Sequence, residues 1–213
     1  MEFAAYTVCP RFRFFINGKE IYFNSHNNMA IVEGGTRLLN ATNILTDQLG
    51  LSVGHYYADL GVGSSMHFIF PAARIVGGEG KVFALDIQKG ILDSVLSRAR
   101  SEGVVNIETV WTDLEVYGAA KDIDDESLDR LSMINVLYQT KLDEHVVNEA
   151  NRMLKPGGRV VVIDWKPTGA SFGPPEEKRT SLDKVRQMTK VVNWREVTAF
   201  EPGPYHFGVV FEK

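Results

Sequence analysis

The sequence predicts an α/β fold in which a mostly parallel sheet carries helices on both of its faces. Short apolar runs typical of buried strands alternate with segments of helical periodicity through most of the chain. This alternation implies right-handed crossovers between parallel strands. One run, Arg159 to Asp164, is almost purely Val and Ile, as expected for a parallel strand that is buried on both faces. A glycine turn at Gly61 and Gly63 joins another apolar strand to a helix.

The composition is that of a globular protein, with 44% hydrophobic and 23% charged residues among 213. The net charge of −4 argues mildly against a broad nucleic-acid-binding face. Cys9 is the only cysteine, which excludes an internal disulfide and a Cys-rich zinc site, and we expect no metal site. Nothing in the sequence resembles a signal peptide or a membrane span, so we expect a cytoplasmic protein.

Residues 1–32 are expected to form an N-terminal extension, and residues 33–213 the main domain. Asn17-Gly18 separates two runs rich in aromatic and β-branched residues, at 12–16 and 19–23, and this arrangement predicts a β-hairpin. An isolated hairpin is only marginally stable. Its apolar side chains must therefore cover the main domain, a second copy of the chain, or the functional site.

Hydrophobic periodicity sets the expected elements of the main domain. We expect a first strand from residue 56 to the glycine turn, and further strands at 81–86, 106–111, 128–135, 159–164, 192–201 and 205–212. The expected helices are 36–50, 66–76, 88–101, 144–154 and 181–190. Pro71 lies inside the second helix, so we expect a kink or break near residue 67. Ser64 or Ser65 is a plausible N-cap for that helix.

The segment from Lys166 to Thr180 is rich in glycine and proline and shows no periodicity. Long loops inside a compact domain are often lids over a site. This loop follows the fifth strand of the main domain, so we expect it at the ligand edge of the sheet. A static surface connection, held in place by its prolines, is the alternative.

Polar residues stand at the ends of five predicted strands, which in a parallel sheet lie at one edge: Asp59, Asp86, Asp113, Asn135 and Asp164. Ligands of open α/β sheets bind at that edge. Each acid taken alone could be an ordinary turn or cap residue. Three acids in register after a glycine turn instead predict a nucleoside site.

Asp59 indicates the charge of the expected ligand. A dinucleotide-binding turn brings a pyrophosphate to a helix N-terminus and has a third glycine where this sequence has Met66. A carboxylate beside the turn repels a pyrophosphate and attracts an ammonium group. The sequence therefore favours a nucleoside with a positive group, such as S-adenosylmethionine. Asp86 is then placed to accept bonds from ribose hydroxyls, and the adenine is expected beside the neighbouring residues Ile87, Asp113 and Leu114.

These motifs make the sequence similar to class I S-adenosylmethionine-dependent methyltransferases, and among them to small bacterial proteins of the ubiquinone/menaquinone-biosynthesis type. The segments that carry the resemblance are Ala58-Asp-Leu-Gly-Val-Gly-Ser64, Val82-Phe-Ala-Leu-Asp86, Asn106 to Asp113, Ile134 to Leu137 and Arg152 to Asp164. The resemblance covers about 56–213 and departs from the family where Ser65 replaces a third glycine. A serine is tolerated there if its φ stays negative.

The resemblance implies a three-layer Rossmann-like methyltransferase fold with seven strands in the order 3-2-1-4-5-7-6, strand 7 being antiparallel. It assigns Asp59, Gly61 and Gly63 to the methionine end of the cofactor, Asp86 to the ribose and Asp113 to the adenine. Asn135 falls at the fourth-strand position near the methyl group. S-Adenosylhomocysteine is the implied product.

The expected function is methyl transfer to a small molecule by a monomer or homodimer. A tRNA or rRNA methyltransferase is the first alternative, since basic residues gather near the last helix: Lys178, Arg179, Lys184, Arg186 and Lys190. A non-catalytic S-adenosylmethionine-binding protein is the second alternative. A nicotinamide oxidoreductase is disfavoured by Asp59 and Met66.

Methyl transfer from a sulfonium depends mainly on alignment and exclusion of water. A general base helps only if the acceptor begins protonated. Tyr138 and His206 are weak candidates for that role, and further polar residues are expected near the same edge: His67, Gln139, Asp164 and Tyr205. No catalytic residue is assigned, because a lone Tyr or His at a strand end is usually structural.

Overall fold

The computed structural model describes residues 13–16, 19–22, 30–31, 39–141, 143–167 and 171–213. Its main element is a seven-stranded sheet with the order β6-β5-β4-β7-β8-β10-β9. The strands are β4 (Tyr56–Leu60), β5 (Lys81–Asp86), β6 (Ile107–Trp111), β7 (Leu128–Ile134), β8 (Leu154–Trp165), β9 (Arg195–Gly203) and β10 (His206–Glu212). Pairing is parallel from β6 to β8, whereas β10 is antiparallel to both of its neighbours. The predicted fold class, strand order and antiparallel strand are thereby confirmed.

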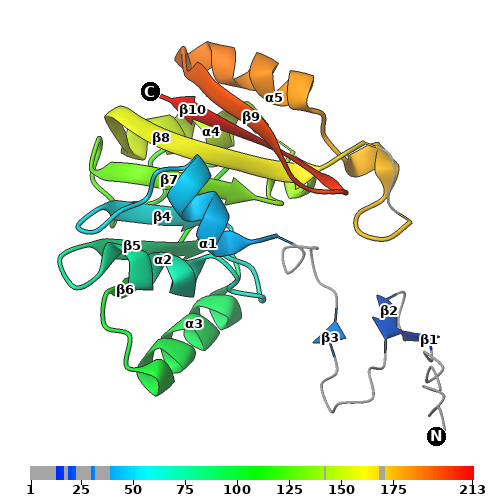
Figure 1. Cartoon of the computed structure of the whole chain (residues 1–213), viewed down its shortest axis with the longest axis horizontal. Coiled ribbons are helices and arrows are strands. Elements are labelled where there is room, and N and C mark those ends of the chain that lie inside the picture. The colour runs from blue at the N-terminus through cyan, green and yellow to red at the C-terminus, as the bar shows by residue number, and fades with distance from the viewer. Residues whose placement is uncertain (1–12, 17–18, 23–29, 32–38, 142, 168–170) are drawn as a thin grey trace, which may run out of the picture.

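Helices cover both faces of the sheet and complete three layers (Figure 1). One face packs against α1 (Ala41–Asn43), α2 (Ile69–Val76) and α3 (Lys89–Glu102), and the other against α4 (Asp143–Met153) and α5 (Leu182–Thr189). Side chains of β4 alternate between the two cores, with Tyr57 on the α2 side and Ala58 and Leu60 on the α4 side. Asp59 therefore shares the α2 face with Tyr57.

The helix after the glycine turn begins later than predicted. Residues 67–68 form a turn, and α2 starts at Ile69, which places Pro71 in the first helical turn. Backbone N–H groups of a first turn have no helical partner, so proline is tolerated there. The expected break near residue 67 is thus the start of the helix. Its N-cap position is Phe68, which makes no side-chain cap bond, so neither Ser64 nor Ser65 caps this helix.

Two other boundaries differ from the predictions. The helix expected over 36–50 is described only from Ala41, where the Asn40 side chain caps it, and it continues as a π-helical turn, η2 (Ile44–Gln48). Strand β8 begins at Leu154 rather than Arg159, because Lys155 to Gly158 form a bulge within the strand.

The N-terminal part forms a second, three-stranded sheet in the order β1-β2-β3. Strands β1 (Arg13–Ile16) and β2 (Lys19–Tyr22) pair antiparallel on either side of the predicted Asn17-Gly18 turn, which lies outside the described residues. The short strand β3 (Ala30–Ile31) pairs with β2. The role of residues 1–32 as a separate extension stays a prediction. Among the described helices, none is long and apolar enough to cross a membrane.

Candidate functional site

The glycine turn is held against the neighbouring strand by its own backbone. The amides of Gly61 and Val62 both donate to the carbonyl of Leu85, at 2.9 and 3.0 Å. Gly61 has a φ of +76° and Gly63 a φ of +61°, conformations that side chains disfavour. A Cβ on Gly61 would lie 2.8 Å from Val136 Cγ2, so this position also has no space for one. Ser65 is absent from the residues with positive φ, which satisfies the condition set for a serine there.

Asp86, the last residue of β5, also holds this turn. Its Oδ2 accepts the amide of Gly63 at 3.1 Å, and its Oδ1 accepts the amide of Gln88 at 2.9 Å. A carboxylate has about four lone-pair positions, so two further bonds can still be accepted. Asp86 is therefore both a structural residue of the turn and an acceptor at the edge of the sheet.

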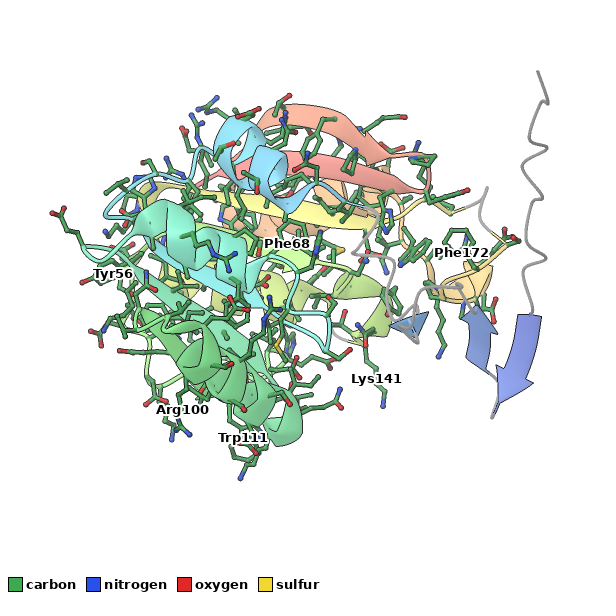
Figure 2. The ribbon with its side chains drawn as sticks, turned by 60° about the horizontal axis from the view of Figure 1, so that its bottom comes forward. Tyr56, Phe68, Arg100, Trp111, Lys141 and Phe172 are labelled. Carbon is green, nitrogen blue, oxygen red and sulfur yellow. The ribbon has the colours of Figure 1, made fainter. Side chains whose placement is uncertain are left out.

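A cavity of about 630 Å³ opens beyond the carboxyl ends of the parallel strands. Its size is typical of small-molecule sites. All eight residues predicted to bind the cofactor line it: Asp59, Gly61, Gly63, Asp86, Ile87, Asp113, Leu114 and Asn135. Phe68, between the turn and α2, also lines it and lies near the centre of Figure 2. Four of the five polar strand-end residues thus line one cavity, and their roles in binding the cofactor stay a prediction.

Asp59 is buried within this cavity wall, with 3% of its surface exposed. Ser132 of β7 lies beside it in the sheet register and donates a hydrogen bond from Oγ to Asp59 Oδ1 at 2.6 Å. Burial raises the pKa of Asp59 to about 7; the Ser132 bond opposes the rise and the nearby charge of Asp86 adds to it. The sequence analysis did not identify Ser132 as a partner of Asp59, because no local pattern of residues indicates this contact.

Residues that follow β5 and β6 form another part of the cavity wall. Ile87 and Leu114 provide apolar surface, and Asp113 Oδ1 accepts the amide of Glu115 at 2.9 Å. Thr112 also lines the cavity, and its buried Oγ1 has no hydrogen-bond partner among the described residues. An orphaned hydroxyl in a cavity wall indicates a polar ligand. Trp111, the last residue of the edge strand β6 and labelled at the bottom of Figure 2, donates from Nε1 to the carbonyl of Ile87 at 2.9 Å.

Asn135, directly after β7, also lines the cavity. It has a φ of +55°, and its carbonyl accepts a bond from Gln139 Nε2 at 2.9 Å. Asparagine tolerates this left-handed conformation because its short polar side chain can bond locally. Tyr138 and Gln139 line the cavity beside it. Asp164 does not; its Oδ2 accepts the Tyr138 amide at 3.3 Å, so it supports this wall from behind.

The structure does not bring His206 to the cavity. Its ring is fully buried and packs against Trp165 with ring centroids 4.4 Å apart. Burial, with the charge of Lys166, lowers the pKa of His206 to about 4, so the imidazole stays neutral. Tyr205 belongs to the same aromatic cluster through Phe172. Neither residue lines the cavity, and of the two main base candidates only Tyr138 does.

His67 is a better-placed histidine. It lines the cavity, and its Nε2 lies 2.7 Å from the carbonyl of Leu39. A carbonyl only accepts, so Nε2 carries the proton in this bond and a neutral ring keeps its lone pair on Nδ1. The polar residues His67, Tyr138, Gln139 and Thr140 thus all line the cavity.

The loop 166–180 is better anchored than its composition indicated. Arg179 donates to the carbonyls of Pro174 and Phe172 at 2.9 and 3.0 Å, and its guanidinium lies over the ring of Trp165. A Cβ on Gly173 would lie 2.7 Å from the Trp165 ring. None of the described residues 171–180 lines the cavity. These contacts favour the static alternative for this part of the loop.

Acidic residues set the charge of the cavity. Four carboxylates line it, those of Asp59, Asp86, Asp113 and Glu115, and its described wall contains no lysine or arginine. Such a site attracts cations and repels phosphate groups. The glycine cradle, the buried acid and the orphaned Thr112 hydroxyl fit a nucleoside that carries positive charge, as S-adenosylmethionine does.

The sheet order and the cavity at its strand ends define a Rossmann-like methyltransferase fold. In agreement, the chain superposes on an S-adenosylmethionine-dependent methyltransferase from Aquifex aeolicus with a TM-score of 0.75 and 24% identity, over 83% of this chain and 91% of that one. The chain belongs to the ubiE/COQ5 methyltransferase family, whose model matches residues 40–171, more than half of the sequence. This membership confirms the predicted resemblance and S-adenosylmethionine as the cofactor.

Two curated relatives show how far the similarity extends. The ubiquinone/menaquinone biosynthesis C-methyltransferase UbiE of Idiomarina loihiensis is 30% identical over 102 residues, which are 47% of this chain and 39% of that protein. The methyltransferase GfsG of Streptomyces halstedii is 30% identical over 135 residues, 63% of this chain and 45% of that protein. The matched region thus spans less than half the length of either relative.

Proposed function

We propose that the protein transfers a methyl group from S-adenosylmethionine to a small-molecule acceptor. The observation that carries the proposal is the anionic cavity at the glycine turn, whose lining holds every residue predicted for the cofactor. S-Adenosylmethionine bears a sulfonium and an ammonium group, which suit four carboxylates, whereas the pyrophosphate of NAD does not.

We propose the following roles for the residues that line the cavity. Asp59 holds the ammonium group, and Gly61 and Gly63 let the backbone approach the methionine end. Asp86 accepts from the ribose hydroxyls, while Ile87, Leu114 and Asp113 bind the adenine. Asn135 lies on the side of the methyl group. Thr112, which the sequence reasoning did not include, adds a hydrogen bond at the purine end.

The acceptor is proposed to bind where the polar side chains of His67, Tyr138, Gln139 and Thr140 share the wall. The protein's contribution is to align the acceptor and exclude water. If the acceptor begins protonated, His67 and Tyr138 are the candidate bases. The name of the Idiomarina relative, a quinone-biosynthesis C-methyltransferase, supports an acceptor that is a small molecule.

An RNA acceptor is less well supported. Of the basic residues near the last helix, Arg179 bonds to backbone carbonyls, and Arg186 forms ion pairs with Glu196 and Asp183. The cavity itself would repel a phosphate backbone, since its charged residues are acids.

Titration calorimetry tests the cofactor part of the proposal. S-Adenosylmethionine and S-adenosylhomocysteine should bind with micromolar affinity, and NAD should give no heat. Heat from NAD, with none from the sulfonium cofactor, would overturn the proposal.

The acceptor class needs a second assay. A cell extract supplied with methyl-labelled cofactor should acquire label in its small-molecule fraction. Label in the RNA fraction alone would favour the first alternative. Tight cofactor binding without label in any fraction would favour the non-catalytic one.

A further inference from the structure

Tyr57, Ser132 and Asp59 form a buried hydrogen-bond chain that ends in the cavity. Tyr57 and Asp59 lie two residues apart on β4, and Ser132 on β7 is the direct neighbour of Asp59. The Tyr57 hydroxyl lies 2.6 Å from Ser132 Oγ, and Ser132 Oγ lies 2.6 Å from Asp59 Oδ1. Tyr57 and Ser132 are completely buried. Neither of these two residues lines the cavity, so the chain reaches it through Asp59.

The direction of the donors follows from the number of protons. Ser132 has one hydroxyl hydrogen, which it donates to Asp59, so the Tyr57 hydroxyl must donate to Ser132. Burial, followed by the charge of Asp59, raises the pKa of Tyr57 well above its usual range, and this keeps the phenol protonated. Both donors therefore point toward Asp59 and favour its ionised form.

Other groups oppose ionisation. Asp59 is almost fully buried, and the charge that acts on it from β5 is another acid, Asp86. Its own strand presents the neutral Tyr57, and β7 presents the neutral Ser132. The remaining titratable groups that line the cavity are His67, Asp113, Glu115 and Tyr138. No described lysine or arginine of the cavity wall stabilises the carboxylate, so a cationic ligand can supply the missing positive charge.

We propose that Ser132, supported by Tyr57, is a positioning residue that sets the charge of Asp59, so that binding of the cofactor's ammonium group is coupled to proton release from Asp59. The inference rests on the proposed function and assigns to it two residues outside the cofactor contacts already proposed. Their role is to keep a buried acid ready to ionise when the ligand arrives.

The sign and size of the effect follow from linkage. A carboxyl with a pKa of about 7 is about one-tenth ionised at pH 6 and about nine-tenths at pH 8. A ligand that binds the ionised form gains about tenfold in affinity between these pH values. By reciprocity, binding lowers the pKa of Asp59. At pH 7 it should release about half a proton, with more released at pH 6 and less at pH 8.

Calorimetry with S-adenosylhomocysteine, in buffers of different ionisation enthalpy at pH 6, 7 and 8, measures both quantities. Methylthioadenosine is the matched probe, because it keeps the nucleoside and lacks the amino-acid end. Its affinity should be independent of pH. Equal pH dependence for the two ligands, or a flat profile for S-adenosylhomocysteine, would overturn the inference and leave the proposed function standing. No binding of S-adenosylhomocysteine at any pH would instead overturn the proposed function.

Substitutions identify the residues responsible. Ser132→Ala should shift the affinity profile to higher pH, with a loss of roughly three- to tenfold at pH 7 that shrinks as pH rises. Ser132→Thr, which keeps the hydroxyl, should restore the wild-type profile. A merely structural role would lower affinity equally at every pH, which would refute the assignment. If Ser132→Ala does not fold, Tyr57→Phe should give a smaller shift in the same direction, and an unshifted profile would count against the proposal.

Two more variants complete the test. Asp59→Asn should bind S-adenosylhomocysteine weakly, without pH dependence and without proton release. His67 also lines the cavity, so His67→Gln is the control that separates its contribution from that of Asp59. It should keep the proton release, and its disappearance in this variant would assign the coupling to His67 and overturn the proposal.

Discussion

The clearest single perturbation of the proposed site is Asp86→Ala. The substitution removes two bonds that the carboxylate accepts from the amides of Gly63 and Gln88, and the proposed bonds to ribose. Bonds to charged groups contribute about 1.5–3 kcal/mol each. Gln88 is exposed, so water can accept its amide hydrogen in the variant, whereas Gly63 is half-buried and its amide is less accessible to water. We therefore expect a loss of about 1–3 kcal/mol in the free energy of unfolding. Removal of an exposed acid without such bonds would cost less.

The same substitution should weaken S-adenosylhomocysteine by about 1.5–3 kcal/mol, or roughly 10- to 150-fold. A cofactor analogue without the ribose 2′-hydroxyl separates direct contact from collapse of the turn. In a double-mutant cycle, variant and analogue should each lose affinity, and their combination should lose little more than either alone. Fully additive losses would refute the ribose contact and leave Asp86 as a residue of the turn only.

Three further predictions concern stability. Gly61→Ala should lower the free energy of unfolding, measured with denaturant, by about 2–4 kcal/mol, because of its positive φ and the clash with Val136. Gly103→Ala has a similar φ but open space around it, so it should cost only about 1–2 kcal/mol. Equal losses would contradict the packing argument. Arg152→Met should cost about 3–5 kcal/mol, because it removes the cationic partner of the buried Glu149 carboxylate, which then keeps the bonds from the amides of Gly118 and Ala120; a change below about 1 kcal/mol would contradict this. The raised pKa of Asp59 means that the folded apo protein binds this proton more tightly than the unfolded chain, so stability falls as pH rises from about 4 to 8. Asp59→Asn should remove up to about 4 kcal/mol of that fall, and an unchanged pH dependence of unfolding would show that Asp59 does not cause it.

The predicted residues that line one cavity in the structure belong to short local patterns of the sequence. The glycine turn and the acids at strand ends depend on short patterns, and parallel pairing brings these ends to one edge. The contact between Ser132 and Asp59 joins residues 73 positions apart. It depends on the register between β4 and β7, which no local pattern specifies. Tyr57 appeared in the sequence only as one apolar residue of a strand.

His206 and the loop 166–180 show the limit of reasoning from composition. His206 was expected near the ligand edge of the sheet. Antiparallel pairing of β10 with β8 instead places it opposite Trp165 inside the molecule. The loop contains few apolar residues and thus predicted a lid. Its anchors are instead one arginine that satisfies two carbonyls and a glycine whose missing side chain admits an indole ring. Hydrogen exchange that is equally slow for 171–180 with and without ligand would establish the static alternative.

The charge at the glycine turn, more than the fold, distinguishes the ligand classes that this type of sheet can bind. Rossmann-like sheets bind anionic dinucleotides through backbone amides at a helix N-terminus. Here the amide of Gly63 is already bonded to Asp86, and Asp59 stands buried at the end of β4. Two acids therefore replace the phosphate as partners of this region. A buried carboxyl with a raised pKa costs the free protein stability near neutral pH. A bound ammonium group would offset that cost, so the feature that destabilises the free protein is also the one that would select a cationic nucleoside.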